Sequence, residues 1–151
     1  MSADGGVLAG RTIVTGVAGD DIHVMGIRLV EHALKSAGAN VVSLGVMTPL
    51  QEFVDATVET AADAVVISSS NGHAAISCDG IRDAFAEGGV GHVRLYIGGK
   101  LRVGSKSGTH EEVEQEFRAL GFDRAFGSDT DLDQAIRVIA DDLAAAKTGT
   151  I

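Results

Sequence analysis

The chain has 151 residues, a length that fits one domain around a single hydrophobic core. Hydrophobic residues make up 45% and aromatic residues only 4%, so the core must consist of Val, Ile, Leu and Ala, which favours a sheet buried on both faces. The formal net charge of −9 argues against nucleic acid and against a membrane surface as partners, because both need a cationic surface. No apolar run reaches the roughly 20 residues of a membrane span, and the first residues lack the layout of a signal peptide. We therefore expect a cytoplasmic protein, and its one cysteine, Cys78, excludes an internal disulfide.

Runs of β-branched residues alternate with helical patterns along the chain, which is typical of βαβ units and a parallel sheet. The alternation predicts strands at 12–17, 40–44, 64–69, 93–97 and 124–126. Apolar residues at three- and four-residue spacing predict helices at 24–37, 50–60, 80–86, 111–120 and 132–145. Gly38 and Gly121 lie where C-terminal helix caps are expected. We expect the domain to span 11–146, with flexible ends at 1–10 and 147–151.

This order of elements predicts an α/β protein with a flavodoxin-like (Rossmann-like), doubly wound, five-stranded parallel sheet in the strand order 2-1-3-4-5. In such a sheet the ligand binds outside the carboxyl ends of the strands, where the strand order reverses between strands 1 and 3. The loops that follow the first, third and fourth strands, at 19–26, 68–72 and 98–104, are therefore the candidate ligand loops.

The first of these loops has the pattern of a metal-ligand loop. Asp21 and His23 are two residues apart, so the carboxylate can accept one ring N–H of the histidine and leave the other nitrogen free and more basic toward a metal. Gly26 follows three residues later, where a missing side chain allows a bulky group to lie against the backbone. The pattern leaves the identity of the metal open.

The other two loops predict a narrow slot beside the first strand. Ser68, Ser69 and Ser70 end the third strand, and their small hydroxyls can hydrogen-bond an aromatic nitrogen or a ribose without filling space. Gly98 and Gly99 end the fourth strand and allow a flat ring to approach the main chain.

Each of these features also has a plain structural explanation. A lone histidine after a strand is often a surface residue, a serine run is often a turn, and paired acids often sit at a helix N-terminus. A receiver domain with this fold uses paired acids after strand 1, but it needs an aspartate where this chain has Ser68 and Ser69. A Rossmann dinucleotide site needs a Gly-x-Gly-x-x-Gly turn, which the loop after the first strand lacks. A zinc hydrolase needs two convergent ligands in addition to the histidine of this loop.

Together these residues carry a resemblance to a family. From Arg11 to Ile139 the chain resembles the small cobalamin-binding subunit of glutamate mutase (methylaspartate mutase). The segments that carry the resemblance are 12–26, with the Asp21-x-His23-x-x-Gly26 pattern, 40–46, 61–64, 68–72, 98–99 and 117–124.

The resemblance implies a site for adenosylcobalamin. The dimethylbenzimidazole tail of the cofactor leaves the cobalt and inserts beside the first strand, and His23 replaces it as axial ligand to cobalt, with Asp21 as its hydrogen-bond partner. The cofactor-binding residues that the resemblance implies are Asp21, Ile22, His23, Val24, Gly26, Ser68, Ser70, Gly98 and Gly99. Two positions depart from the family pattern: Ser70 stands where an apolar residue is usual, and Asn71 stands where an aromatic residue is usual. We expect a slightly altered pocket for the tail.

The resemblance also implies a division of labour between two proteins. This chain would bind the cofactor and carry no catalytic residue, while a large barrel-type catalytic subunit would interconvert L-glutamate and L-threo-3-methylaspartate by a radical rearrangement. Only Lys100 and Arg102 on the ligand loops could bind a substrate carboxylate, and we expect both at the surface, so substrate binding is expected on the partner. The resemblance implies that the two proteins form a heterotetramer. Two alternatives stay open: a corrinoid carrier for a methyltransferase, which would bring an N-terminal helical bundle, and a receiver-like interaction module that holds no corrinoid.

Overall fold

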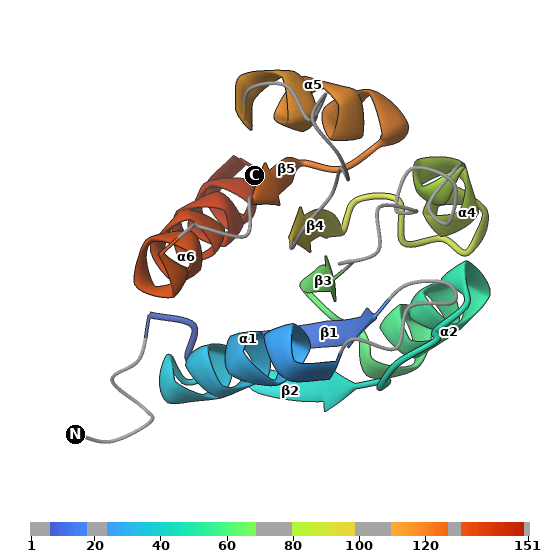
Figure 1. Cartoon of the computed structure of the whole chain (residues 1–151). Helices are drawn as coiled ribbons and strands as arrows, with labels where there is room; N and C mark the ends of the chain where they lie inside the picture. Colours follow the sequence, from blue (N-terminus) through green and yellow to red (C-terminus); the bar gives the residue numbers. More distant parts are fainter. Residues whose placement is uncertain (1–6, 18–23, 69–79, 99–109, 127–130, 150–151) are drawn as a thin grey trace.

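The computed structural model describes residues 7–17, 24–68, 80–98, 110–126 and 131–149, without the side chains of 24–26, 110–114 and 145–149. Strands and helices alternate along the chain, as predicted (Figure 1). The elements are β1 (Thr12–Val17), α1 (Val24–Ser36), β2 (Asn40–Ser43), α2 (Leu50–Thr60), β3 (Ala64–Ser68), α4 (Ile81–Glu87), β4 (Arg94–Gly98), α5 (His110–Leu120), β5 (Arg124–Phe126) and α6 (Leu132–Gly149).

The strands form one 5-stranded sheet in the order β2-β1-β3-β4-β5, and every neighbouring pair is parallel. This confirms the predicted doubly wound, flavodoxin-like sheet. Helices α1 and α6 cover one face, and α2, α4 and α5 cover the other (Figure 1). All five residues of β3 are buried, as expected for a central strand that both helical layers cover.

Two clusters of buried residues form the core, one on each face of the sheet. On the face covered by α1 and α6, which we call the α1/α6 face, Leu34, Tyr96 and Ile139 belong to the cluster. On the opposite face, Phe53, Phe85 and Phe117 of the three helices pack against strand residues. Along each strand, residues of the two clusters alternate, because successive side chains point to opposite faces of the sheet.

The ends of the domain differ in part from the sequence-based expectation. Leu8 is fully buried in the core, and its backbone N–H donates to the carbonyl of Ala37 at 2.9 Å, so the segment expected to be flexible contains an anchored residue. Helix α6 continues to Gly149, beyond the predicted end at 145. Gly38 and Gly121 do end helices, with φ values of 97° and 122° that favour glycine.

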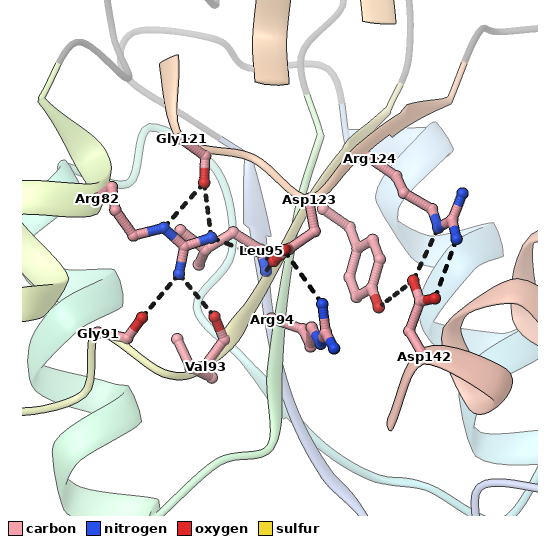
Figure 2. Close-up of polar contacts among 10 residues, drawn as sticks. Arg82, Gly91, Val93, Arg94, Leu95, Gly121, Asp123, Arg124 and Asp142 are labelled. Atoms are coloured by element: carbon pink, nitrogen blue, oxygen red, sulfur yellow. Dashed lines mark hydrogen bonds and ion pairs between the residues drawn. The ribbon is translucent and has the colours of Figure 1, made fainter. Parts of the chain in front are cut away.

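A network of polar contacts joins α4, β4 and β5 at the amino ends of the strands (Figure 2). The Asp123 carboxylate accepts hydrogen bonds from the backbone N–H of Leu95 at 2.8 Å and from Arg82 at 3.1 Å, and it pairs with Arg94 at 3.3 Å. Arg82 also donates to the carbonyls of Gly91, Val93 and Gly121. The family-like segment 117–124 therefore contributes to the fold at the edge opposite the candidate ligand loops.

A second contact holds α6 against the sheet. Asp142 of α6 accepts two hydrogen bonds from Arg124, at 2.7 and 3.0 Å, and one from the hydroxyl of Tyr96 at 2.9 Å. The hydrogen bonds from Arg124 hold the pKa of Asp142 below its ordinary value, although burial acts in the opposite direction. Burial raises the pKa of Tyr96, and the Asp142 carboxylate raises it further, so Tyr96 stays protonated as a donor. Through these bonds Asp142 positions α6 over β4 and β5.

Candidate functional site

The carboxyl ends of β1, β3 and β4 meet in the middle of the sheet. Val17 pairs with Ser68, and Ser68 pairs with Gly98, so the last residues of these three strands form one row across the sheet. The three predicted ligand loops leave the sheet from this row. The topology therefore brings them to neighbouring positions at one edge, although most of their residues lie outside the described ranges.

Ser68 and Gly98 lie on the α1/α6 face of the sheet. On β3, Ala64 and Val66 belong to the cluster on this face, and Ser68 is the next residue with the same orientation. On β4, Tyr96 belongs to the same cluster and Gly98 follows it two residues later. At the carboxyl edge of this face, Ser68 and Gly98 thus occupy the positions that apolar side chains occupy deeper in the sheet.

Ser68 is a buried residue with a hydroxyl that is available for a ligand. The residue is 8% exposed, and its hydroxyl has no hydrogen-bond partner among the residues that the structure describes. The hydroxyl oxygen itself is not fully buried, because no described side-chain oxygen is both buried and without a partner. Ser68 is therefore placed to donate to, or accept from, a group that enters between the sheet and the helices.

The two glycines at this end of the sheet have different roles. A Cβ on Gly16 would lie 2.9 Å from ring atoms of Phe53 and 3.3 Å from Oγ1 of Thr48, so packing requires a glycine there. A Cβ on Gly98 would meet Phe126 only at ordinary contact distances, 3.5 Å and 3.7 Å. The described part of the fold therefore does not need a glycine at 98, which is consistent with a ligand that takes up this space.

Two further features of this edge were missed by sequence reasoning. Thr15, which is fully buried on the α1/α6 face, donates to Oε2 of Glu31 on α1 at 2.7 Å. The loop between β2 and α2 also reaches this edge, where Val17 bonds through its backbone to Gly45 and Thr48. A sequence signal existed only for Glu31, whose charge interrupts the inward-facing apolar positions of α1.

Most of the predicted cofactor-binding residues lie outside the described residues. These are Asp21, Ile22, His23, Ser70 and Gly99. Val24 and Gly26 fall in the first turn of α1, which begins directly after His23, but their side chains are not described. Of the predicted set, the structure thus brings together Ser68 and Gly98. The described segments contain no cluster of three or more His, Cys, Asp or Glu side chains that could hold a metal ion.

Comparisons with known proteins identify the family. Residues 11–137 match the family model described as B12 binding domain. A "Glutamate mutase sigma subunit 2" from Haloarcula marismortui is 47% identical over 133 residues, which cover 88% of each chain. A glutamate mutase sigma subunit from Carboxydothermus hydrogenoformans is 45% identical over 87% of this chain and 94% of its own. The chain belongs to the glutamate mutase sigma subunit family. It has the B12 binding domain that its sequence predicted.

Solved structures show that other proteins share the fold of this sigma subunit family member. A cobalamin-binding protein from Desulfitobacterium hafniense superposes with a TM-score of 0.70 at 22% identity, covering 87% of this chain and 58% of that one. The signal receiver domain of NarL from Mycobacterium tuberculosis reaches a TM-score of 0.60 at 12% identity, covering 90% and 98%. This chain covers about three fifths of the length of the cobalamin-binding protein from Desulfitobacterium hafniense. Because corrinoid proteins and receiver domains share the fold, the fold alone does not decide the function.

The structure also bears on membrane association. Within the described ranges, none of the helices combines the length and the apolar character that crossing a membrane would require.

Proposed function

We propose that this chain is the cobalamin-binding subunit of an adenosylcobalamin-dependent glutamate mutase, acting in the cytoplasm with a large barrel-type catalytic subunit in a heterotetramer. The partner would interconvert L-glutamate and L-threo-3-methylaspartate. The observation that carries the proposal is the row of Val17, Ser68 and Gly98 at the carboxyl edge, in a chain that is 47% identical to a glutamate mutase sigma subunit. This row lies at the switch point of the sheet, where α/β proteins of this type bind their ligands.

The described residues fit the nucleotide tail of cobalamin. Ser68, a buried residue, offers a hydroxyl that no described residue uses, and Gly98 leaves space that packing does not require. An aromatic base that enters beside β1 could take a hydrogen bond from Ser68 while its ring lies against Gly98. Gly99 and Ser70, one and two residues beyond these strand ends, would extend the same contacts.

The cobalt itself would be held by the loop after β1. His23 would be its axial ligand, and Asp21 would fix the tautomer of the histidine and raise its basicity. Ile22 and Val24 flank the ligand in sequence, and Gly26, in the first turn of α1, would leave room for the tail. When bound, adenosylcobalamin supplies the radical chemistry through homolysis of its cobalt–carbon bond. This chain's own contribution would be to bind the cofactor, ligate the cobalt and present it to the partner.

The proposal can be tested by spectroscopy on the purified protein with bound cob(II)alamin. Electron paramagnetic resonance resolves the nuclear-spin splitting from the axial nitrogen. In protein labelled uniformly with ¹⁵N, the triplet from a ¹⁴N ligand should become a doublet, because the ligand nitrogen belongs to the protein. A triplet that persists would mean that the cofactor's own base is still bound to cobalt.

Two variants assign the ligand. His23→Ala should lose the ¹⁵N doublet, whereas His32→Ala, which removes an exposed histidine from α1, should keep it. A mixture of this chain, the large subunit and adenosylcobalamin should turn over glutamate, and this chain with cofactor alone should not. No spectral change on adding cobalamin would refute the corrinoid function and favour an interaction module instead.

A further inference from the structure

The loop between β2 and α2 contains a residue whose backbone conformation is unusual for its type. Met47 has a φ of 55°, which lies in the left-handed region that residues with a side chain seldom adopt. Among the described residues other than glycine, only Ala61 shares this feature, and Ala61 ends α2 with its backbone N–H bonded to the carbonyl of Thr57. Met47 precedes α2 and ends no helix. The strain at Met47 is therefore not explained by the end of a helix.

The side chain of Met47 is exposed from a loop that is held in place. Met47 is 55% exposed. On one side of it, the carbonyl of Gly45 accepts the backbone N–H of Val17 at 2.8 Å, and on the other side the backbone N–H of Thr48 donates to the carbonyl of Val17 at 2.8 Å. Thr48 is also buried, and its Oγ1 donates to the carbonyl of Gly45 at 3.2 Å. These bonds close the loop around Met47, so its side chain projects to solvent from a fixed backbone.

Met47 lies at the edge of the sheet where the cofactor is proposed to bind. Both backbone tethers of its loop end at Val17, the last residue of β1, and the loop with His23 follows this strand. The other large apolar side chains that are exposed among the described residues lie before β1 or within helices; they are Val7, Leu29 and Val58. In the described loops at the carboxyl edge, Met47 is thus the exposed apolar side chain that a protein docking over the cofactor would meet.

We infer that Met47 is a contact residue for the large catalytic subunit, and this rests on the function proposed above. A cofactor at the carboxyl edge is presented to the partner from this edge, so the partner approaches the loops around it. An apolar surface of the partner would remove the Met47 side chain from water, and an unbranched thioether adapts to such a surface. Because the loop is already fixed, little backbone entropy is lost on docking. The burial gained on assembly would offset the strain that the free chain carries.

The test measures the affinity of the cobalamin-loaded chain for the purified large subunit by isothermal titration calorimetry. Met47→Asn removes the apolar side chain and should raise the dissociation constant at least about tenfold, as expected when a buried methionine contact is lost. Met47→Leu keeps an apolar side chain of similar volume and should retain most of the affinity. Val58→Asn is the matched control, because it removes an exposed apolar side chain from α2 and should leave the affinity unchanged.

Two measurements on the chain without the large subunit separate this contact from other roles of Met47. Asparagine adopts the left-handed region more readily than methionine does, so Met47→Asn should melt at or above the wild-type temperature. The affinity of Met47→Asn for cobalamin should equal that of wild type, because the partner and not the corrin ring covers this side chain.

Oxidation of Met47 locates the contact directly. Hydrogen peroxide converts exposed methionine to its sulfoxide, and peptide mass spectrometry distinguishes Met47 from the other two methionines, Met1 and Met25. The rate of oxidation at Met47 should fall several-fold when the large subunit is bound. Cobalamin without the large subunit should leave this rate unchanged.

Each of the other results would overturn the contact. Wild-type affinity of Met47→Asn for the large subunit, or an oxidation rate that the large subunit does not change, would exclude it and leave the proposed function standing. A Met47→Asn chain that melts well below wild type would assign the residue to the fold, and one that loses cobalamin affinity by itself would assign it to the cofactor site. If the wild-type chain with cobalamin does not bind the large subunit, the proposed function fails together with this contact.

Discussion

Gly16 and Gly98 show how one residue type serves two purposes at the same edge of a sheet. Gly16 faces α2, where the ring of Phe53 takes the space of a side chain. Gly98 faces the α1/α6 side, where the described residues leave room for a Cβ. From the sequence both glycines look like strand-end residues, and only the packing on each face tells them apart.

This difference predicts opposite results for two alanine substitutions. Gly16→Ala should lower the free energy of unfolding by about 1–3 kcal/mol, because the new Cβ overpacks against Phe53. Gly98→Ala should change it by less than about 1 kcal/mol, since alanine reduces the backbone entropy lost on folding. Gly98→Ala should nevertheless weaken cobalamin binding. Urea unfolding and cobalamin titration measure the two effects, and a Gly98→Ala chain with normal cobalamin affinity would remove Gly98 from the site.

A second prediction concerns the proposed metal ligand and its neighbour. His23→Ala deletes the ligand, whereas Asp21→Asn keeps it and only removes the carboxylate that makes it more basic. Asp21→Asn should therefore weaken cobalamin binding by about 10–100-fold, less than His23→Ala does. Titrations that follow the absorption of the corrinoid compare the two variants. Equal losses would contradict the assigned roles.

At the scale of elements, long strands and helices were predictable because their signals are local. The Val- and Ile-rich runs of β1 and β3 and the apolar spacing of α2 placed these elements correctly. The polar contacts that join elements were not predictable in the same way. Arg82 and Asp123 are 41 residues apart, and nothing near either one in the sequence indicates the other. The same holds for Leu8, an isolated apolar residue beside glycines that becomes part of the core.

The contact between α6 and the sheet makes a prediction about pH. Because the pKa of Asp142 in the folded chain lies below its ordinary value of 3.8, the unfolded chain binds this proton more readily. The stabilisation from Asp142 is therefore complete above about pH 4 and is lost as the pH falls through the lowered pKa. Asp142→Asn should be less stable than wild type by about 2 kcal/mol at pH 7, and the gap should narrow below pH 3.8.

Urea unfolding at pH 7 and at pH 3 measures this difference in stability. Asp141→Asn is the matched control, because it changes an exposed carboxylate in the same turn of α6 and should differ little from wild type at either pH. A gap between Asp142→Asn and wild type that stayed constant from pH 7 to pH 3 would mean that the charge of Asp142 does not hold α6.

At the scale of the whole molecule, the topology predicted the location of the site better than its details. A doubly wound parallel sheet places its ligand loops at the switch point whatever their sequence, so the sequence predicts Ser68 and Gly98 at the same edge. Their pairing across β3 and β4 is a finding of the structure. The contact between Thr15 and Glu31 could not be predicted, because the two residues meet only when α1 packs on β1.

If the cofactor binds between α1, α6 and the sheet, it should stabilise the molecule as a whole. A ligand that binds only the folded state adds about 2.7 kcal/mol at a free concentration of 100 times its dissociation constant. For a chain of this length that corresponds to a rise in melting temperature of about 5–10 °C. We expect this rise with cobalamin, followed by circular dichroism, and a much smaller one in His23→Ala at the same concentration. A spectral shift on binding without any rise in melting temperature would mean that the unfolded chain binds the corrinoid equally well, which would contradict a site built by the folded α1/α6 layer.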